Sequence, residues 1–413
     1  MAELIETKHE QEKLILVGVC LGDEKETADS LEELEELCNT AGAVVVGTIS
    51  QNRDSFHPGY YVGTGKIDEI RMMLEETGAD GIVCDDELSP AQMKNLEMEL
   101  GVRVMDRTLV ILDIFATRAT TSEGKIQVEL AQLKYRSGRL IGMGKVLSRL
   151  GGGIGTRGPG EKKLEVDRRL IKSRIAQLRR ELEEVEKHRD LTRTQRNKNH
   201  MKVAAIVGYT NAGKSTLLNR LTDAGVLEEN KLFATLDPTT RNLRLDSGQE
   251  ILLTDTVGFV RKLPHHLIEA FKSTLEEAKY ADFIIHVVDA SNPQWGKQMA
   301  IVYKTLDDLG VKDKKVLTLF NKQDLVTEEE VRKDLRADYT LPIQARNSVG
   351  LEEVKQHLEE ILREDKKLIE KVFHYSEAGI IQEIRKRGEL LEEEYRDDGI
   401  YVKAYVPQDM YNI

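Results

Sequence analysis

Residues 203–216 read VAAIVGYTNAGKST, and this stretch decides the fold of the segment around it. The apolar run VAAIV precedes the pattern Gly-x-x-x-x-Gly-Lys-Ser, and LLNRL follows with the apolar spacing of a helix. A strand, a glycine-rich turn and a helix in this order form a phosphate-binding loop, in which backbone N–H groups and the helix N-terminus hold phosphate oxygens. The sequence therefore predicts an α/β domain that binds a nucleoside phosphate.

Three residues of this region have separate expected roles. Lys214 would reach the β- and γ-phosphates, and the Ser215 hydroxyl would bind Mg²⁺. Between the loop and the next predicted strand lies LFATLDPTTRN (232–242), which is rich in hydroxyls. Its Thr235 is the candidate for a second Mg²⁺ ligand in the triphosphate state.

An Asp-x-x-Gly motif follows in LLTDTVGFVRKLP (252–264). Asp255 falls at the C-terminal end of a predicted strand, where an open α/β sheet places its ligand. It is expected to present a magnesium-linked carboxylate, with Gly258 sensing the γ-phosphate. Phe259 stands where Ras-like enzymes often carry the Gln that orients the attacking water. Because a phenyl ring has no donor or acceptor, we expect slow hydrolysis until a partner, or a monovalent cation such as K⁺, completes the site.

NKQD (321–324) predicts the base that is bound. The Asp324 carboxylate can accept from two adjacent donors, a ring N–H and an exocyclic amine, which guanine offers and adenine lacks. Asn321 can bond the far side of the ring, and the Lys322 stem can lie over its face. QAR (344–346), after another strand-like run, would support the base through backbone N–H groups.

Residues 1–121 predict a further α/β domain. Apolar runs at 14–20, 43–50, 81–86 and 102–106 alternate with helical patterns at 24–41, 66–78 and 90–100, and 108–119 predicts a closing helix. Such alternation favours a mainly parallel sheet.

Residues 122–195 predict an antiparallel helical hairpin. Its apolar stripes have coiled-coil spacing and consist of Ile126, Leu130 and Leu133, then Leu164, Ile171, Ile175, Leu178, Leu182 and Val185. Between them, residues 137–160 hold nine glycines and the cations Arg139, Lys145, Arg149 and Arg157, so we expect a glycine-rich basic tip. Residues 129–200 contain 19 Lys and Arg against 9 Asp and Glu, whereas the whole chain has a formal net charge of −12. This local positive charge indicates contact with a nucleic-acid backbone, against a plain linker.

The remaining chain predicts a nucleotide-binding domain over 200–365 and a small α+β unit over 366–413, read as a strand (VFHYSE), a helix (AGIIQEIRKRGELLEEE) and a strand (IYVKAYVP). No signal peptide is visible, and no apolar run approaches the roughly 20 residues of a membrane span. Cys20, Cys38 and Cys84 have no metal-ligand spacing, so we expect reduced thiols in a cytoplasmic protein.

The chain resembles the HflX family of ribosome-associated GTPases, which are related to translation factors. The resemblance runs to about residue 365 and rests on YYVGTGK (60–66), DDELSPAQMKNLE (85–97), DRTLVILDIFATRA (106–119), EGKIQVELAQLKY (123–135), GGGIGTRGPGE (151–161), FATLDPTTR (233–241) and DTVGFVRKLP (255–264). It implies GTP hydrolysis, binding to the large ribosomal subunit with the hairpin tip near the peptidyl-transferase region, and splitting or rescue of ribosomes under stress. We expect a monomer that does not bind DNA and does not insert stably into a membrane.

The resemblance also assigns site residues. It implies that Ser215 and Thr235 bind Mg²⁺. GTP goes to Gly208, Tyr209, Thr210, Asn211, Ala212, Gly213, Lys214, Ser215, Phe233, Ala234, Thr235, Leu236, Asp237, Asp255, Thr256, Val257, Gly258, Asn321, Lys322, Gln323, Asp324, Gln344, Ala345 and Arg346. Gln344 departs from the family, in which this loop commonly begins with Ser, but the contact there is largely through the backbone.

Other functions explain less of the sequence. Phe259 suits a nucleotide-gated rRNA-binding module with negligible turnover, and a membrane or division GTPase would need an anchor or a basic amphipathic terminus. VGTGK (62–66) fails as a second phosphate loop, since Tyr60 replaces the first Gly and Ile67 the final Ser or Thr. His265 and His266 are expected to be solvated rather than catalytic.

Overall fold

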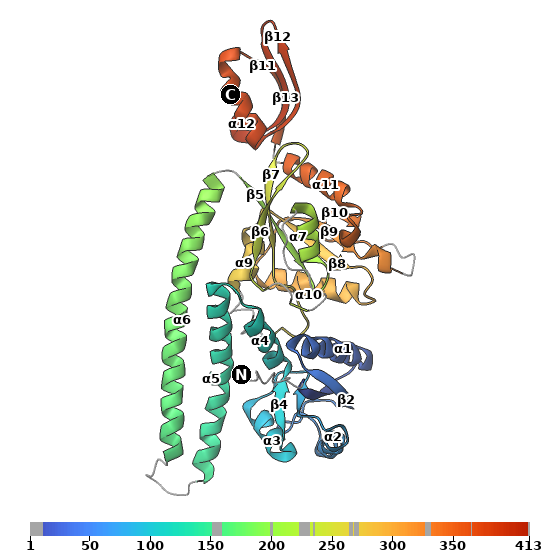
Figure 1. Ribbon diagram of the computed structural model, residues 1–413, viewed down its shortest axis with the longest axis vertical. Helices are drawn as coiled ribbons and strands as arrows, with labels where there is room; N and C mark the ends of the chain where they lie inside the picture. Colours follow the sequence, from blue (N-terminus) through green and yellow to red (C-terminus); the bar gives the residue numbers. More distant parts are fainter. Residues whose placement is uncertain are drawn as a thin grey trace, which may run out of the picture. The chain divides into compact units, whose positions relative to one another are not determined.

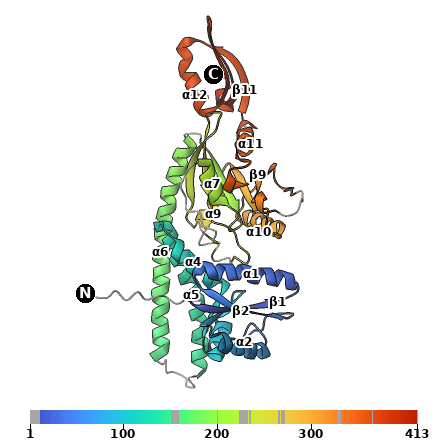
Figure 2. The same ribbon diagram turned by 45° about the vertical axis from the view of Figure 1, so that its right-hand side comes forward.

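The computed structural model describes residues 11–150, 159–198, 201–222, 232–233, 236–263, 267, 272–326, 332–364 and 366–411 (Figures 1 and 2). The chain divides into two compact units. One unit contains Met1–Val185 and Arg261–Phe271, and the other contains Glu186–Val260 and Lys272–Ile413. Across the described ranges, no helix is both long and apolar enough to cross a membrane.

The first unit contains a four-stranded parallel sheet, as predicted. Its order is β2-β1-β3-β4, from β1 (Lys13–Cys20), β2 (Val44–Asn52), β3 (Gly81–Cys84) and β4 (Arg103–Asp106). Helices α2 (Thr64–Thr77) and α3 (Pro90–Leu100) cover one face, and α1 (Glu24–Ala41) and α4 (Arg107–Arg118) pack together on the other (Figure 1). Apolar residues fill β1 because a parallel sheet is buried on both faces.

Two long helices, α5 (Ser122–Leu150) and α6 (Pro159–Lys198), follow α4. The prediction of an irregular tip over 137–160 is wrong for its first part, because α5 continues to Leu150. Only three of the nine glycines lie in α5, and the residues between them are good helix formers that outweigh a cost of about 1 kcal/mol per glycine. Residues 151–158, including Arg157, and the side chains of Lys145 and Arg149 lie outside the described part.

Arg139 does not belong to a free basic tip. Its guanidinium pairs with Asp106 at 2.7 Å and lies 3.2 Å from the ring centroid of Tyr135. It therefore serves the packing of α5 against the carboxyl end of β4. Further along the helices, Arg174 of α6 donates to both carboxylate oxygens of Glu129 in α5 at 2.7 and 2.8 Å.

The second unit is built on a six-stranded sheet with the order β10-β9-β8-β5-β7-β6. Its strands are β5 (Lys202–Gly208), β6 (Thr239–Arg244), β7 (Glu250–Asp255), β8 (Phe283–Asp289), β9 (Lys315–Asn321) and β10 (Tyr339–Pro342), and only β6 runs antiparallel to its neighbour. The described helices that pack with this sheet are α7 (Lys214–Thr222), α9 (Lys272–Tyr280), α10 (Trp295–Asp308) and α11 (Leu351–Glu364). The parallel strands bring the predicted nucleotide loops to one edge of the sheet.

The C-terminal residues form a three-stranded antiparallel sheet, β11-β13-β12, with one helix. Its elements are β11 (Lys366–Phe373), α12 (Ala378–Arg387), β12 (Glu389–Arg396) and β13 (Gly399–Pro407). The predicted helix is too long, because residues 389–396 form β12. Gly388 ends the helix, and pairing with β13 outweighs the helix propensity of the Glu- and Leu-rich run. Arg363 of α11 pairs with the buried Glu389 carboxylate and joins this sheet to α11.

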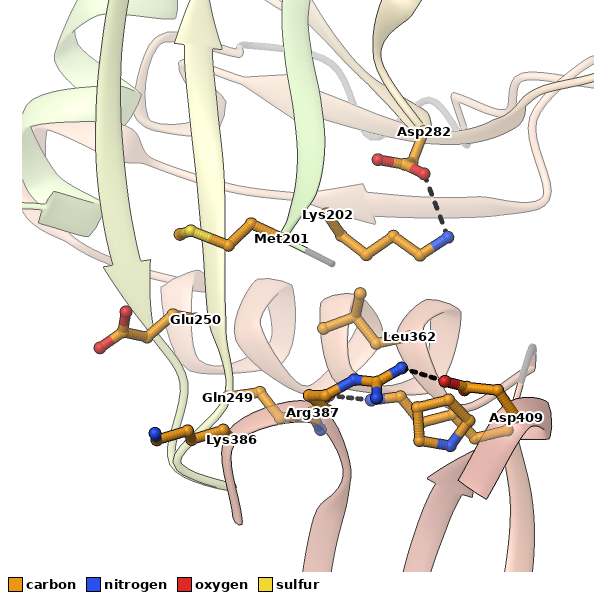
Figure 3. A pocket seen from close by; sticks show the side chains of 11 residues that line it. Met201, Lys202, Gln249, Glu250, Asp282, Leu362, Lys386, Arg387 and Asp409 are labelled. Atoms are coloured by element: carbon orange, nitrogen blue, oxygen red, sulfur yellow. Dashed lines mark hydrogen bonds and ion pairs between the residues drawn. The ribbon is translucent and has the colours of Figure 1, made fainter. Parts of the chain in front are cut away.

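A cavity of about 330 Å³ lies at this junction, at the start of β5 and β7. Figure 3 shows the Lys202–Asp282 pair on one side and the Arg387–Asp409 pair on the other. Because β5 begins here and ends at the phosphate loop, the cavity and the nucleotide site occupy opposite edges of the sheet. Each pair stays on its own side of the cavity, since Lys202 and Asp282 both flank strands of the six-stranded sheet and Arg387 and Asp409 both belong to the C-terminal elements.

Candidate nucleotide-binding and hydrolysis site

The phosphate loop runs from the end of β5 to the start of α7. Gly208 lies so close to β8 that a Cβ atom would meet the Val287 carbonyl oxygen at 2.2 Å. Gly213 has a φ of +98°, and a Cβ there would lie 2.2 Å from Asn321 Nδ2. The loop therefore has the tight backbone curl that a phosphate cradle requires. Among the residues that the structure describes, the buried Thr210 hydroxyl of this loop has no hydrogen-bond partner.

Lys214 and Ser215 begin α7. The buried Lys214 ammonium donates to the Tyr209 carbonyl oxygen at 2.8 Å. Burial lowers the Lys214 pKa to about 8, although the Asp255 carboxylate opposes the shift. A bound phosphate would favour the charged form of this lysine.

The predicted magnesium residues are partly assembled. The Ser215 hydroxyl donates to Asp255 Oδ2 at 2.7 Å. A hydroxyl and a carboxylate at this separation form the hard oxygen donor set that Mg²⁺ prefers, so the chemistry fits the ion. Thr235, the other predicted ligand, lies outside the described residues, as does Ala234.

The loop after β7 pairs with the phosphate loop through its backbone. The Thr210 N–H donates to the Phe259 carbonyl oxygen at 2.8 Å, and the Phe259 N–H donates to the Gly208 carbonyl oxygen at 3.1 Å. The phenyl ring is only 2% exposed, so Phe259 is a packing residue that holds this loop in place. At Gly258 a Cβ would lie 3.0 Å from Lys214 Nζ, which places the predicted γ-phosphate sensor beside the lysine.

The predicted base loops meet at the ends of β9 and β10. Asn321 donates through Nδ2 to the Ala212 carbonyl oxygen and accepts through Oδ1 from the Ala345 N–H, both at 2.9 Å. It therefore ties the phosphate loop to the loop at 344–346. Asp324 is exposed in the short 3₁₀ helix Gln323–Leu325, and Lys322 precedes that helix.

The other predicted residues show a range of exposure. Tyr209, Ala212, Phe233, Leu236, Thr256, Val257 and Ala345 are buried, Asn211, Asp237, Gln323 and Gln344 are half-buried, and Arg346 is exposed. His265 and His266 lie outside the described residues.

Sequence reasoning missed Asp289. This residue ends β8 in FIIHVVD, and its carboxylate accepts from Lys322 Nζ at 2.7 Å. The available signal was an Asp at the C-terminal end of a strand that would neighbour the NKQD strand.

A cluster of acidic residues lies at the carboxyl end of β3, within the first unit. The buried Arg107 guanidinium donates to Asp85 at 2.6 Å and to Glu33 at 2.8 Å. Lys262, from the segment of 261–271, pairs with Asp85 at 2.5 Å and with Asp86 at 2.7 Å. Burial would raise the Asp85 pKa, but Arg107 and Lys262 outweigh it and hold that pKa below its usual value.

A phosphate loop, an Asp-x-x-Gly loop and an NKxD loop at the carboxyl edge of a mostly parallel sheet define a P-loop GTPase, which hydrolyses GTP. Three family models match the chain. They are described as GTP-binding GTPase N-terminal (residues 28–116), GTP-binding GTPase Middle Region (118–196) and 50S ribosome-binding GTPase (203–322).

Similar proteins cover almost the whole chain. The GTPase HflX of Lacrimispora saccharolytica is 63% identical over 411 residues, which is 100% of this chain and 97% of the relative. That of Caldanaerobacter subterraneus is 50% identical, covering 97% and 92%. That of Escherichia coli is 43% identical, covering 85% and 83%. The chain belongs to the HflX family of GTPases.

Proposed function

We propose that this GTPase binds the large ribosomal subunit in a nucleotide-dependent way and acts there to split or rescue stalled ribosomes. The observation that carries the proposal is the match of residues 203–322 to a family described as 50S ribosome-binding GTPases. The positive charge of residues 129–200 supports rRNA as the contact, because Lys and Arg neutralise phosphates. GTP with Mg²⁺ would occupy the predicted residues, and the protein would act as a cytoplasmic monomer.

Sedimentation with purified ribosomal subunits tests this proposal. We expect the chain to pellet with large subunits in GTP or a non-hydrolysable analogue, and to pellet less in GDP. Equal binding in all three nucleotides would contradict nucleotide control. Multiple-turnover phosphate release with large subunits would then separate an enzyme from an rRNA-binding module with negligible turnover.

The Asp324→Asn change tests the base assignment. The amide presents a donor where guanine also presents donors, so GTP affinity should fall about 10- to 100-fold, as expected for one or two lost hydrogen bonds. The affinity for xanthosine triphosphate should rise, because its exocyclic oxygen accepts a hydrogen bond where the amine of guanine donates one. Competition between the two nucleotides for a fluorescent analogue measures the ratio, and undiminished GTP affinity would refute the role of Asp324.

The hairpin tip should bind through counterion release. Replacing Lys145, Arg149 and Arg157 with Ala should weaken large-subunit binding. The slope of log affinity against log salt concentration should become shallower by roughly two to three units. Arg139 is left intact, because its pairing with Asp106 serves the fold of the first unit.

A matched control removes the same three charges elsewhere. Lys297, Lys304 and Lys312 are exposed on and beside α10. Their replacement with Ala should leave the slope within about one unit of the wild type. If both triple variants behave alike, net charge rather than the hairpin governs binding.

A further inference from the structure

Lys322 contributes a long side chain to the proposed base site. Its expected role rests on a four-carbon stem lying over the purine ring, and such a stem is mobile unless its end is held. The backbone is already constrained, because Lys322 has a φ of +62°, in a region that non-glycine residues rarely adopt. The position of the stem therefore depends on what binds the ammonium group.

Asp289 binds that group. Asp289 lies opposite Asn321 in the β8–β9 register, and Asp289 Oδ2 accepts from Lys322 Nζ at 2.7 Å. Asp289 Oδ1 accepts from the Ser291 N–H at 3.0 Å and from its hydroxyl at 2.6 Å. The carboxylate is thus oriented on one side by a turn and uses its other oxygen for the lysine.

The pair is also shielded from water. The Lys322 and Asp289 side chains are 22% and 15% exposed. Salt screens such a partly buried pair much less than an exposed one. The ion pair can therefore persist in solution and keep the stem in one place.

We propose that Asp289 is a positioning residue for the purine ring, which acts by holding Lys322 as one wall of the base pocket. This inference rests on the proposed guanine site, and it assigns affinity for the purine ring and selection of guanine to different residues. The Asp289–Lys322 pair contributes affinity for any purine nucleotide and slows its release, because the stem contacts a ring face. Asp324 selects guanine, because it contacts the ring edge.

The Asp289→Asn change tests the proposal, since it keeps the shape and an acceptor for Ser291 but removes the charge. We expect the dissociation constant of fluorescently labelled GDP to rise about tenfold, mainly through faster release. The affinity for the inosine diphosphate analogue should fall by the same factor, which leaves the guanine-to-hypoxanthine ratio unchanged. Tripolyphosphate has no base, so its affinity should not change.

A double-mutant cycle shows whether Asp289 acts through Lys322. Lys322→Met keeps an apolar stem without the charge, and Asp289→Asn should have no further effect in that background. Asp307→Asn is the matched control, because Asp307 pairs with Arg336 at 3.0 Å on α10, and it should bind GDP like the wild type.

Three results would overturn the proposal. They are equal losses for GDP and tripolyphosphate, a changed ratio between the two purines, and an additive loss in the Lys322→Met background. If Asp324→Asn leaves GTP preference unchanged, the base site itself is misassigned. If that variant behaves as expected and Asp289→Asn has no effect, only the positioning role fails.

Discussion

The Gly213→Ala protein is expected to bind GDP several hundred-fold more weakly than the wild type. Gly213 has a φ of +98°, and an added Cβ would meet Asn321 Nδ2 at 2.2 Å. Asn321 would have to leave its hydrogen bonds with Ala212 and Ala345. Two bonds at about 1 kcal/mol each and backbone strain of about 1–2 kcal/mol give about 3–4 kcal/mol.

Gly248→Ala is the matched control for strain alone. Gly248 also has a positive φ, of +82°, but nothing lies within 4 Å of an added Cβ. This variant should lose about 1 kcal/mol of unfolding free energy and bind GDP normally. Fluorescent GDP titration and thermal melts of both proteins separate the two effects. GDP binding by Gly213→Ala within tenfold of the wild type would show that the Asn321 brace is dispensable.

Large ribosomal subunits are expected to accelerate GTP hydrolysis by roughly 10³–10⁵-fold over the free protein. The buried Phe259 ring cannot orient water, and its backbone is paired to the phosphate loop. The free rate should therefore be at or below the ~10⁻³–10⁻⁴ s⁻¹ of an unassisted small GTPase. We propose K⁺ as a lesser activator at Asn211, where positive charge would stabilise charge developing on the phosphates.

Turnover in KCl and in NaCl, with and without subunits, measures both contributions. Asn211→Ala should remove any difference between the salts and leave the ribosomal effect. Phe259→Gln should not raise the free rate, because the buried position would hold the amide away from solvent and cost about 1–3 kcal/mol of stability. Fast turnover by the free wild type in NaCl would contradict an incomplete site, and equal rates in the two salts would exclude K⁺.

Most of the fold was predictable because its signals are local. The apolar run of β1 and the glycine loop before α7 define their elements without help from distant residues. The wrong secondary-structure prediction at the C-terminal helix lies where pairing with a distant strand determines the structure. Residues 389–396 have helical composition but pair with β13. The error in α5 was instead local, because glycine content was weighed above the helix formers between the glycines.

In the candidate site, too, residues within local motifs could be predicted and residues that depend on distant contacts could not. Lys214, Asp255 and Asp324 could be named from motifs, because each motif fixes a side chain relative to a strand end. Asp289 was missed although it ends a predicted strand, because its contact with Lys322 depends on the pairing of β8 with β9, which the motif does not give. Arg139 was assigned to the tip from composition, and only the ion pair with Asp106 reveals its place in the packing.

The Lys262 contacts have a consequence for fragments of this protein. Residues 261–271 group with the first unit although the chain on both sides belongs to the second. A shortened gene that encodes only residues 186–413 would leave the Lys262 ammonium without Asp85 and Asp86, and one that encodes residues 1–185 would leave those acids without it. Neither fragment keeps these ion pairs, so we expect the stability of each fragment to differ from that of the same residues in the intact chain. A charge reversal at Lys262 therefore calls for a compensating reversal at Asp85 or Asp86, far away in the sequence.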